Sequence, residues 1–130
     1  MAATRREARE RALELCYEIE TRDAEADALL GDLPVAPDPY ALELVEGVAA
    51  HRTEIDALLS ELSERWAVDR MPAVDRALLR IGGYELGWEP ELPTAVIIDE
   101  AVELAGRYST RDSSRFVNAL LSRMAAELRP

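Results

Sequence analysis

The sequence predicts an all-α protein. The chain of 130 residues is 48% hydrophobic but only 5% aromatic, and alanine and leucine dominate its apolar residues. This composition favours closely packed helices over strands, which are rich in β-branched and aromatic residues. Apolar residues recur at helical spacing, and no alternating strand pattern occurs. The length fits one domain, in which we expect approximate subdomains of residues 1–65 and 66–130.

Two helices are expected before a proline-rich linker. A helix over about residues 4–20 is predicted because its apolar residues share one face. A weaker helix over 24–30 ends at Gly31. The stretch GDLPVAPDPY follows, and no helix is expected to cross its three prolines.

A longer helix is expected after this linker. Asp38 is a suitable N-cap, and Pro39 fits the first helical position. Apolar residues at helical spacing continue to residue 62, but Thr53 is also a plausible start for a second helix. The pattern is compatible with one helix and with two.

A helix over about residues 73–88 is apolar on two sides. One stripe contains Leu78 and Ile81, and the other contains Leu79 and Leu86. Such a helix is either central to the fold or covered on one side by a partner, and both can hold.

Glu85 lies in the middle of the first of these stripes. A buried carboxylate without a partner is costly, so we expect it to meet a guanidinium or unpaired backbone N–H groups. Arg80 lies about 140° away around the same helix, so the partner should come from another segment. Glu85 is therefore expected to be structural.

Two further helices are expected near the C-terminus. The stretch EPELP breaks the preceding helix, and Thr94 is a suitable cap for the next one. The polar loop GRYSTRDSS separates it from a last helix. That helix is expected to bury Phe116, Val117, Leu120, Leu121 and Met124.

The sequence offers little for catalysis, and we predict no enzyme, no cofactor and no metal site. His51 is the only histidine, and Cys16 lies on an apolar stripe without a nearby histidine. Asp99, Glu100 and Glu103 crowd one helix, but helical di-metal sites normally pair Glu-x-x-His motifs, which are absent. A solvated acidic face is the better interpretation.

Two features of the sequence predict the cellular location of the protein. A single cysteine excludes an intramolecular disulfide and favours a reducing compartment. No apolar run approaches the roughly 18 residues of a spanning helix, and the N-terminus lacks the pattern of a signal peptide. We therefore expect a cytoplasmic protein without membrane contact.

A basic cluster opens this acidic chain. The net charge is -11, yet residues 1–11 hold four arginines against two glutamates. On a helical wheel Arg5, Arg6 and Arg9 share a flank that continues to Tyr17. These arginines suit contact with phosphates, although a solvated helix laced with ion pairs explains them too. Because the acidic bulk repels nucleic acid, such contact should be local and helped by a partner.

A second basic cluster lies in the loop before the last helix. Arg107, Arg111 and Arg115 are opposed only by Asp112, and Tyr108 lies among them. Arginines next to a stacking aromatic suit an unstacked single strand of nucleic acid. Two such clusters in so acidic a chain strengthen the hypothesis of a nucleic-acid face.

Three stretches resemble one protein family. RREARERALELCYE, VDRALLRIGGYEL and ELPTAVIIDEAVELAGRYSTRDSSRFVNALLSRM are similar to NusB, the bacterial transcription antitermination factors. The chain departs from the common family pattern at Asp99 and Ala119, where Asn and Gly are usual. The resemblance implies about seven helices in two packed three-helix subdomains and no catalysis.

The resemblance also implies partners and site residues. NusB proteins bind boxA RNA of nascent transcripts, mainly ribosomal RNA leaders, together with the ribosomal protein NusE in the RNA polymerase antitermination complex. Some form homodimers that cover part of this face, so the oligomeric state is left open. The family's RNA-binding positions correspond here to Arg5, Arg6, Arg9 and the loop Arg107–Arg115, including Tyr108, Arg111 and Asp112; its NusE-facing positions correspond to Tyr17 and Asp75. A second hypothesis is a helical protein-binding adaptor that makes no direct RNA contact.

Overall fold

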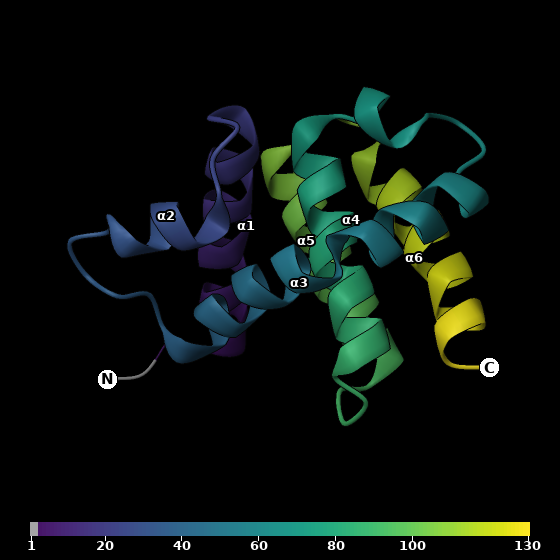
Figure 1. The fold of residues 1–130 in the computed structure, drawn as a ribbon. Helices are drawn as coiled ribbons and strands as arrows, with labels where there is room; N and C mark the ends of the chain where they lie inside the picture. The colour runs from purple at the N-terminus through teal and green to yellow at the C-terminus, as the bar shows by residue number, and fades with distance from the viewer. Residues whose placement is uncertain (1–2) are drawn as a thin grey trace.

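The computed structural model describes residues 3–130, and within them the protein is all-helical, which confirms the predicted fold class (Figure 1). The elements are α1 (Arg5–Thr21), α2 (Ala26–Gly31), α3 (Pro39–Leu62), the 3₁₀ helix η1 (Val68–Arg70), α4 (Ala73–Trp88), α5 (Thr94–Tyr108) and α6 (Ser113–Leu128). The described residues contain no strand. None of their helices has the length and apolar character needed to cross a membrane.

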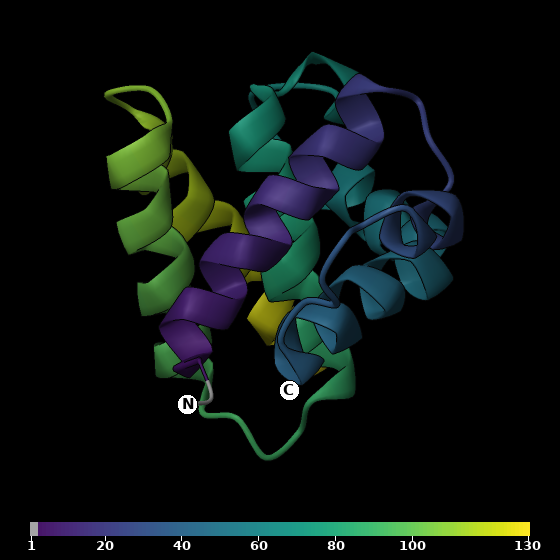
Figure 2. The ribbon, with the colours of Figure 1, turned by 90° about the vertical axis from the view of Figure 1, so that its left-hand side faces the viewer.

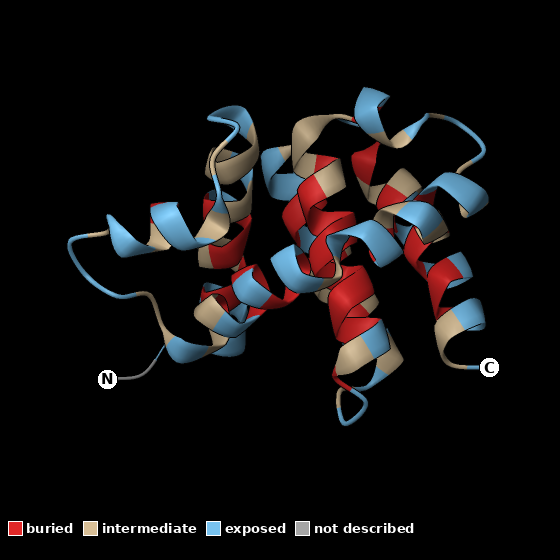
Figure 3. Cartoon of the chain, in the orientation of Figure 1, coloured by how far each residue is buried: buried red, intermediate tan, exposed pale blue. Residues whose placement is uncertain are grey.

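α4 is the central helix of the fold. Its residues 77–86 are all buried, and α1, α3, α5 and α6 pack around it (Figure 3). Figure 2 shows α1 lying across α4, with α5 to one side. The two apolar stripes predicted on this helix therefore both face other elements of the same chain.

α3 is one continuous helix of 24 residues, which settles the choice between one helix and two. The Tyr40 N–H donates to Asp38 Oδ2 at 3.0 Å, and Pro39 occupies the first helical position, so both predicted start signals are confirmed. Midway along α3, Gly47 lies against the ring of Tyr84 on α4. A Cβ at this position would be 2.3 Å from two ring atoms, so the close approach of the helices requires glycine.

α5 begins where the sequence predicted, but for another reason. The N-cap is Pro93, which makes no side-chain capping bond, and Thr94 is the first residue of the helix. The Thr94 hydroxyl instead accepts a hydrogen bond from Arg129 at 3.1 Å. Arg129 also donates to the main-chain carbonyl oxygens of Glu85, Leu86, Glu89 and Leu92. One side chain after α6 thus ties the end of α4 to the start of α5.

Buried apolar side chains from both halves of the chain form one cluster. It includes Leu15, Leu44, Leu79, Leu104 and Leu121, which come from α1, α3, α4, α5 and α6. The division into subdomains 1–65 and 66–130 stays a prediction. What matters for function is that this core holds α1 and α5 on the same side of α4 (Figure 2).

Candidate nucleic-acid interface

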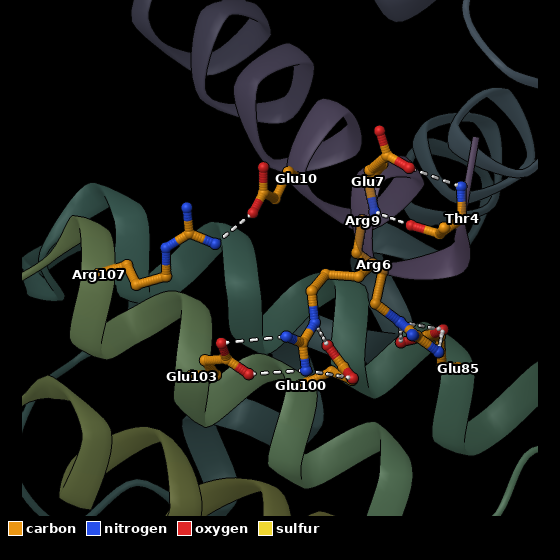
Figure 4. Close-up of polar contacts among 9 residues, drawn as sticks. All are labelled: Thr4, Arg6, Glu7, Arg9, Glu10, Glu85, Glu100, Glu103 and Arg107. Atoms are coloured by element: carbon orange, nitrogen blue, oxygen red, sulfur yellow. Dashed lines mark hydrogen bonds and ion pairs between the residues drawn. The ribbon is translucent and has the colours of Figure 1, made fainter.

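A capping box fixes the first turn of α1. The Glu7 N–H donates to Thr4 Oγ1 at 3.1 Å, and the Thr4 N–H donates to Glu7 Oε1 at 3.0 Å (Figure 4). These bonds satisfy two main-chain donors that a helix start leaves unpaired. Arg5 and Arg6 occupy the turn that the box fixes, and both are exposed, as the prediction of an accessible basic cluster requires.

Arg6 reaches across to two carboxylates on α5. Its Nε and Nη2 donate to the two oxygens of Glu100 at 3.0 and 3.1 Å, and Nη2 lies 2.8 Å from Glu103 Oε2 (Figure 4). The hydrogen bond to Glu100, together with the charges of Glu100 and Glu103, raises the pKa of Arg6. The Arg6 side chain stays 50% exposed, so its guanidinium is both paired and accessible.

Arg107 makes the reverse connection, from α5 back to α1. Its Nη1 lies 2.5 Å from Glu10 Oε1, and its guanidinium carbon lies 5.1 Å from the ring centre of Tyr108. Residues 97 positions apart in the chain are thereby joined. We call the surface made by Arg6, Glu10, Glu100, Glu103 and Arg107 the α1–α5 ridge. It brings one arginine from each predicted cluster onto one face.

Arg9 requires a correction, because it does not face solvent. The residue is 4% exposed, and its Nε donates to both oxygens of Glu85 at 3.2 and 3.0 Å. The prediction that Glu85 meets a guanidinium from another segment is confirmed, and its structural role stays a prediction. Arg9 lies one turn deeper along α1 than Arg5, where α4 covers it. It therefore supports the surface without forming part of it.

Tyr40 is a neighbour of the basic cluster that sequence analysis missed. The Arg5 guanidinium carbon lies 4.0 Å from the centre of the Tyr40 ring, and the Tyr40 hydroxyl donates to Glu85 Oε2 at 2.5 Å. Burial and this hydrogen bond raise the pKa of Tyr40, so its hydroxyl remains a donor. Nothing in the periodicity links the start of α3 with the start of α1, so no sequence signal indicated this contact.

Asp75 also requires a correction. It is 0% exposed, so in this structure it holds the loop before α6 instead of facing a partner. Its Oδ1 accepts a hydrogen bond from Ser109, whose hydroxyl accepts from Ser113 at 3.0 Å. The Thr110 N–H in turn donates to the Ser113 hydroxyl at 3.1 Å. This chain of hydrogen bonds anchors the loop to the first turn of α4.

The remaining predicted residues lie at the surface. Tyr17 is 44% and Tyr108 48% exposed, and Arg111, Asp112 and Arg115 are exposed as well. Asp112 and Arg115 line a cavity of about 340 Å³ whose other lining residues include Arg65, Phe116 and Arg123. Arg65 and Arg123 stand outside both clusters in the sequence, so only the fold shows that this hollow gathers three arginines.

The residues considered for other chemistry have structural surroundings. Burial raises the pKa of the Cys16 thiol to about 12, which makes it a poor nucleophile. His51 stacks on Trp88 with ring centres 4.0 Å apart. Glu100 and Glu103 bind Arg6, and no histidine, cysteine, aspartate or glutamate cluster within residues 3–130 is arranged to hold a metal ion.

The protein is thus a small all-helical domain that exposes arginines and tyrosines on α1, at the end of α5, in the following loop and at the start of α6. The chain belongs to the NusB family, whose family model matches residues 6–126. Curated relatives that are 42–50% identical to this chain are named transcription antitermination proteins.

Known relatives and structures agree with this assignment. The chain is 50% identical over 127 residues to the transcription antitermination protein NusB of Saccharopolyspora erythraea, covering 93% of this chain and 86% of that protein. Its fold is similar to that of T. maritima NusB, with a TM-score of 0.89, 34% identity, and coverage of 100% and 96% of the two chains. A crystal structure of NusB and NusE in complex with dsRNA is similar as well, with a TM-score of 0.82 and 25% identity over 95% of this chain and 96% of that one.

Proposed function

We propose that this protein binds boxA-type single-stranded RNA in nascent transcripts together with NusE, as part of the RNA polymerase antitermination complex in the cytoplasm. The observation that carries the proposal is the α1–α5 ridge, which places Arg6 and Arg107 on one face of a chain with net charge -11. The similar structure of NusB and NusE in complex with dsRNA supports the partnership with NusE and with RNA.

Each exposed residue has a role in this proposal. Arg5, Arg6 and Arg107 contact phosphates, and Tyr108 stacks on an unpaired base beside Arg107. The exposed Arg111 and Arg115 extend the contact toward α6, where Asp112 limits how closely a phosphate approaches. Arg9 acts indirectly, since it holds Glu85 and so fixes α1 on α4.

NusE is needed because the acidic surface repels RNA. A basic partner offsets part of this charge and adds its own RNA contacts, so the pair should bind more tightly than either protein alone. Tyr17 is an exposed aromatic residue, typical of an interface anchor, and we assign it to the contact with NusE. A second copy of the chain bound to this face would compete with RNA. Sedimentation of the protein without RNA measures whether such a dimer forms.

The test is a salt titration of RNA binding in the presence of NusE. Replacing Arg5 and Arg6 with alanine should weaken binding and reduce the log–log salt slope by about 0.7 for each phosphate that the protein no longer neutralises. The matched control replaces two other arginines with alanine. Arg11 lies on α1 and pairs with Glu14, and Arg22 is the C-cap of α1 and pairs with Glu18. An unchanged slope in the Arg5 and Arg6 variant, with NusE still bound, would favour the protein-binding adaptor instead.

A further inference from the structure

The arginines of the α1–α5 ridge are already occupied by carboxylates of the same protein. We propose that Glu10, Glu100 and Glu103 occupy the places of RNA phosphates and keep the ridge closed until RNA displaces them. We call these three residues the acid latch. The inference rests on the proposed function and adds its regulation: the latch sets how weakly the protein binds RNA.

The geometry of Arg6 resembles phosphate recognition. Its Nε and Nη2 donate in parallel to the two oxygens of Glu100, which is the two-pronged arrangement that arginine uses for carboxylates and phosphates alike. The other edge of the guanidinium is engaged as well, with Nη1 3.3 Å from Glu103 Oε1 and Nη2 2.8 Å from Glu103 Oε2. A phosphate that binds Arg6 in the same two-pronged way therefore has to displace Glu100 or Glu103, although the guanidinium is partly exposed (Figure 4).

Arg107 is paired with a carboxylate from the opposite helix, although through one nitrogen only. Its Nη1 is held by Glu10, whose side chain is 26% exposed. The latch thus comes from both helices: α5 supplies the acids for the arginine of α1, and α1 supplies the acid for the arginine of α5. Carboxylates of this protein therefore pair with both arginines of the ridge, more completely at Arg6 than at Arg107.

The latch pairs can open, in contrast to the pair beneath them. Arg6 and Glu103 are 50% and 43% exposed, and Arg107 is 48% exposed, whereas Arg9 and Glu85 are 5% and 1% exposed. Ion pairs at such exposed positions are weak, whereas Glu100, which is 19% exposed and binds Arg6 with both oxygens, holds more firmly. A strand that offers several phosphates at once can replace the weak pairs first. A single anion gains too little to compete. The latch therefore favours polyanions held close by a bound partner.

The test compares two variants with the same change in net charge. Glu10, Glu100 and Glu103 are replaced with glutamine, and the control replaces Glu46, Glu61 and Glu127, which lie on α3 and α6 away from the ridge. RNA affinity is measured without NusE. The latch variant should bind boxA-type RNA on the order of ten-fold more tightly than the control variant, because three weak exposed pairs no longer compete. A gain no larger than the control's, or a weaker affinity, would overturn the proposal.

A second arm separates occupation of Arg6 from general repulsion. The change of Glu100 and Glu103 to glutamine is repeated in a chain that carries Arg6→Ala. If the carboxylates act by occupying Arg6, the gain disappears in this background, whereas a gain that persists would overturn the latch. If the larger variants fold poorly, Glu103→Gln alone, at a 43% exposed position, is compared in the same way with and without Arg6→Ala. Unchanged RNA binding by Arg6→Ala itself, with NusE present, would count against the proposed function instead.

Discussion

Arg9 and Glu85 form a buried ion pair between α1 and α4. Arg9 Nη2 lies 2.9 Å from Glu85 Oε2, with side chains 5% and 1% exposed, and the Tyr40 hydroxyl donates to the same carboxylate. The pair fixes α1 on the central helix just below the exposed Arg5 and Arg6. Its charges are thus structural, although they lie within one turn of the proposed RNA contacts.

Removing either partner of this pair should destabilise the protein strongly. Glu85→Ala leaves the Arg9 guanidinium buried without a counterion, which should lower the free energy of unfolding by about 3–5 kcal/mol. Arg9→Met combined with Glu85→Leu should cost less than either single alanine change, because no charge is left buried. Urea unfolding measures all of these variants. With saturating NusE, the folded fraction of Glu85→Ala should still bind RNA; wild-type stability without RNA binding would place Glu85 in the site instead.

Substitutions of Tyr17 and Asp75 should have different effects on stability and on NusE binding, although the family resemblance assigns both residues to the NusE contact. Tyr17→Ala changes an exposed residue, so the free energy of unfolding should stay within about 0.5 kcal/mol while NusE binding weakens at least about ten-fold. Asp75→Arg inserts a bulky cation at a fully buried position and should unfold the protein. Thermal unfolding and a NusE titration separate the two. A stable Asp75→Arg protein that fails only to bind NusE would restore Asp75 to the interface.

The same substitution at two glycines should have opposite effects. Gly47→Ala would place a Cβ 2.3 Å from the ring of Tyr84, and the overpacking should cost about 1–3 kcal/mol. Gly87→Ala on α4 meets only Leu128 at an ordinary 3.7 Å, so the better helix propensity of alanine should stabilise by up to about 1 kcal/mol. Urea unfolding of both variants checks this. Equal effects would show that α3 and α4 adjust at Gly47.

Glu89 should make stability fall as the pH rises. It is 7% exposed, and among the described residues its Oε1 has no hydrogen-bond partner. Burial, followed by the neighbouring carboxylates of Glu43 and Glu91, raises the pKa of Glu89 from 4.5 to about 8. Unfolding restores the ordinary pKa, so between these values the folded state keeps a proton that the unfolded state has released. The stabilising contribution is complete below pH 4.5 and disappears as the pH approaches 8.

Glu89→Gln removes this dependence, because glutamine is neutral throughout. Its free energy of unfolding should vary less than that of the wild type between about pH 5 and about pH 9, and should exceed it at the upper end. Glu127→Gln, an exposed change on α6, is the matched control and should follow the wild type. Parallel curves for Glu89→Gln and the wild type would contradict the raised pKa.

Local signals predicted most of the fold. The Asp38 cap, the break after Trp88 and the 3.6-residue periodicity all act within one or two helical turns, and a sequence displays them directly. The need of Glu85 for an external guanidinium was also predictable from its place on an apolar stripe. The identity of that guanidinium was not, because Arg9 lies 76 positions away.

The candidate site was predicted less completely. A helical wheel gives the angle of a residue around the axis but not its depth against other helices, so it grouped the buried Arg9 with the exposed Arg5 and Arg6. The burial of Asp75 was not predictable from its surroundings in the sequence, because the serine that binds it belongs to a distant loop. The carboxylates on the ridge were likewise invisible as partners, since each comes from the opposite helix.

The long sequence separations across the ridge have a consequence for synthesis. α1 is made first, but Glu85 and Glu100, which hold Arg9 and Arg6, follow 76 and 94 positions later. A nascent chain that has not yet produced α4 therefore lacks the partner of Arg9, and one that has not yet produced α5 lacks the partners of Arg6. Contacts this distant also form slowly, because the intervening chain must be ordered first. Under the proposed function, the closed state of Arg6 is therefore reached only after the chain has been made as far as Glu103.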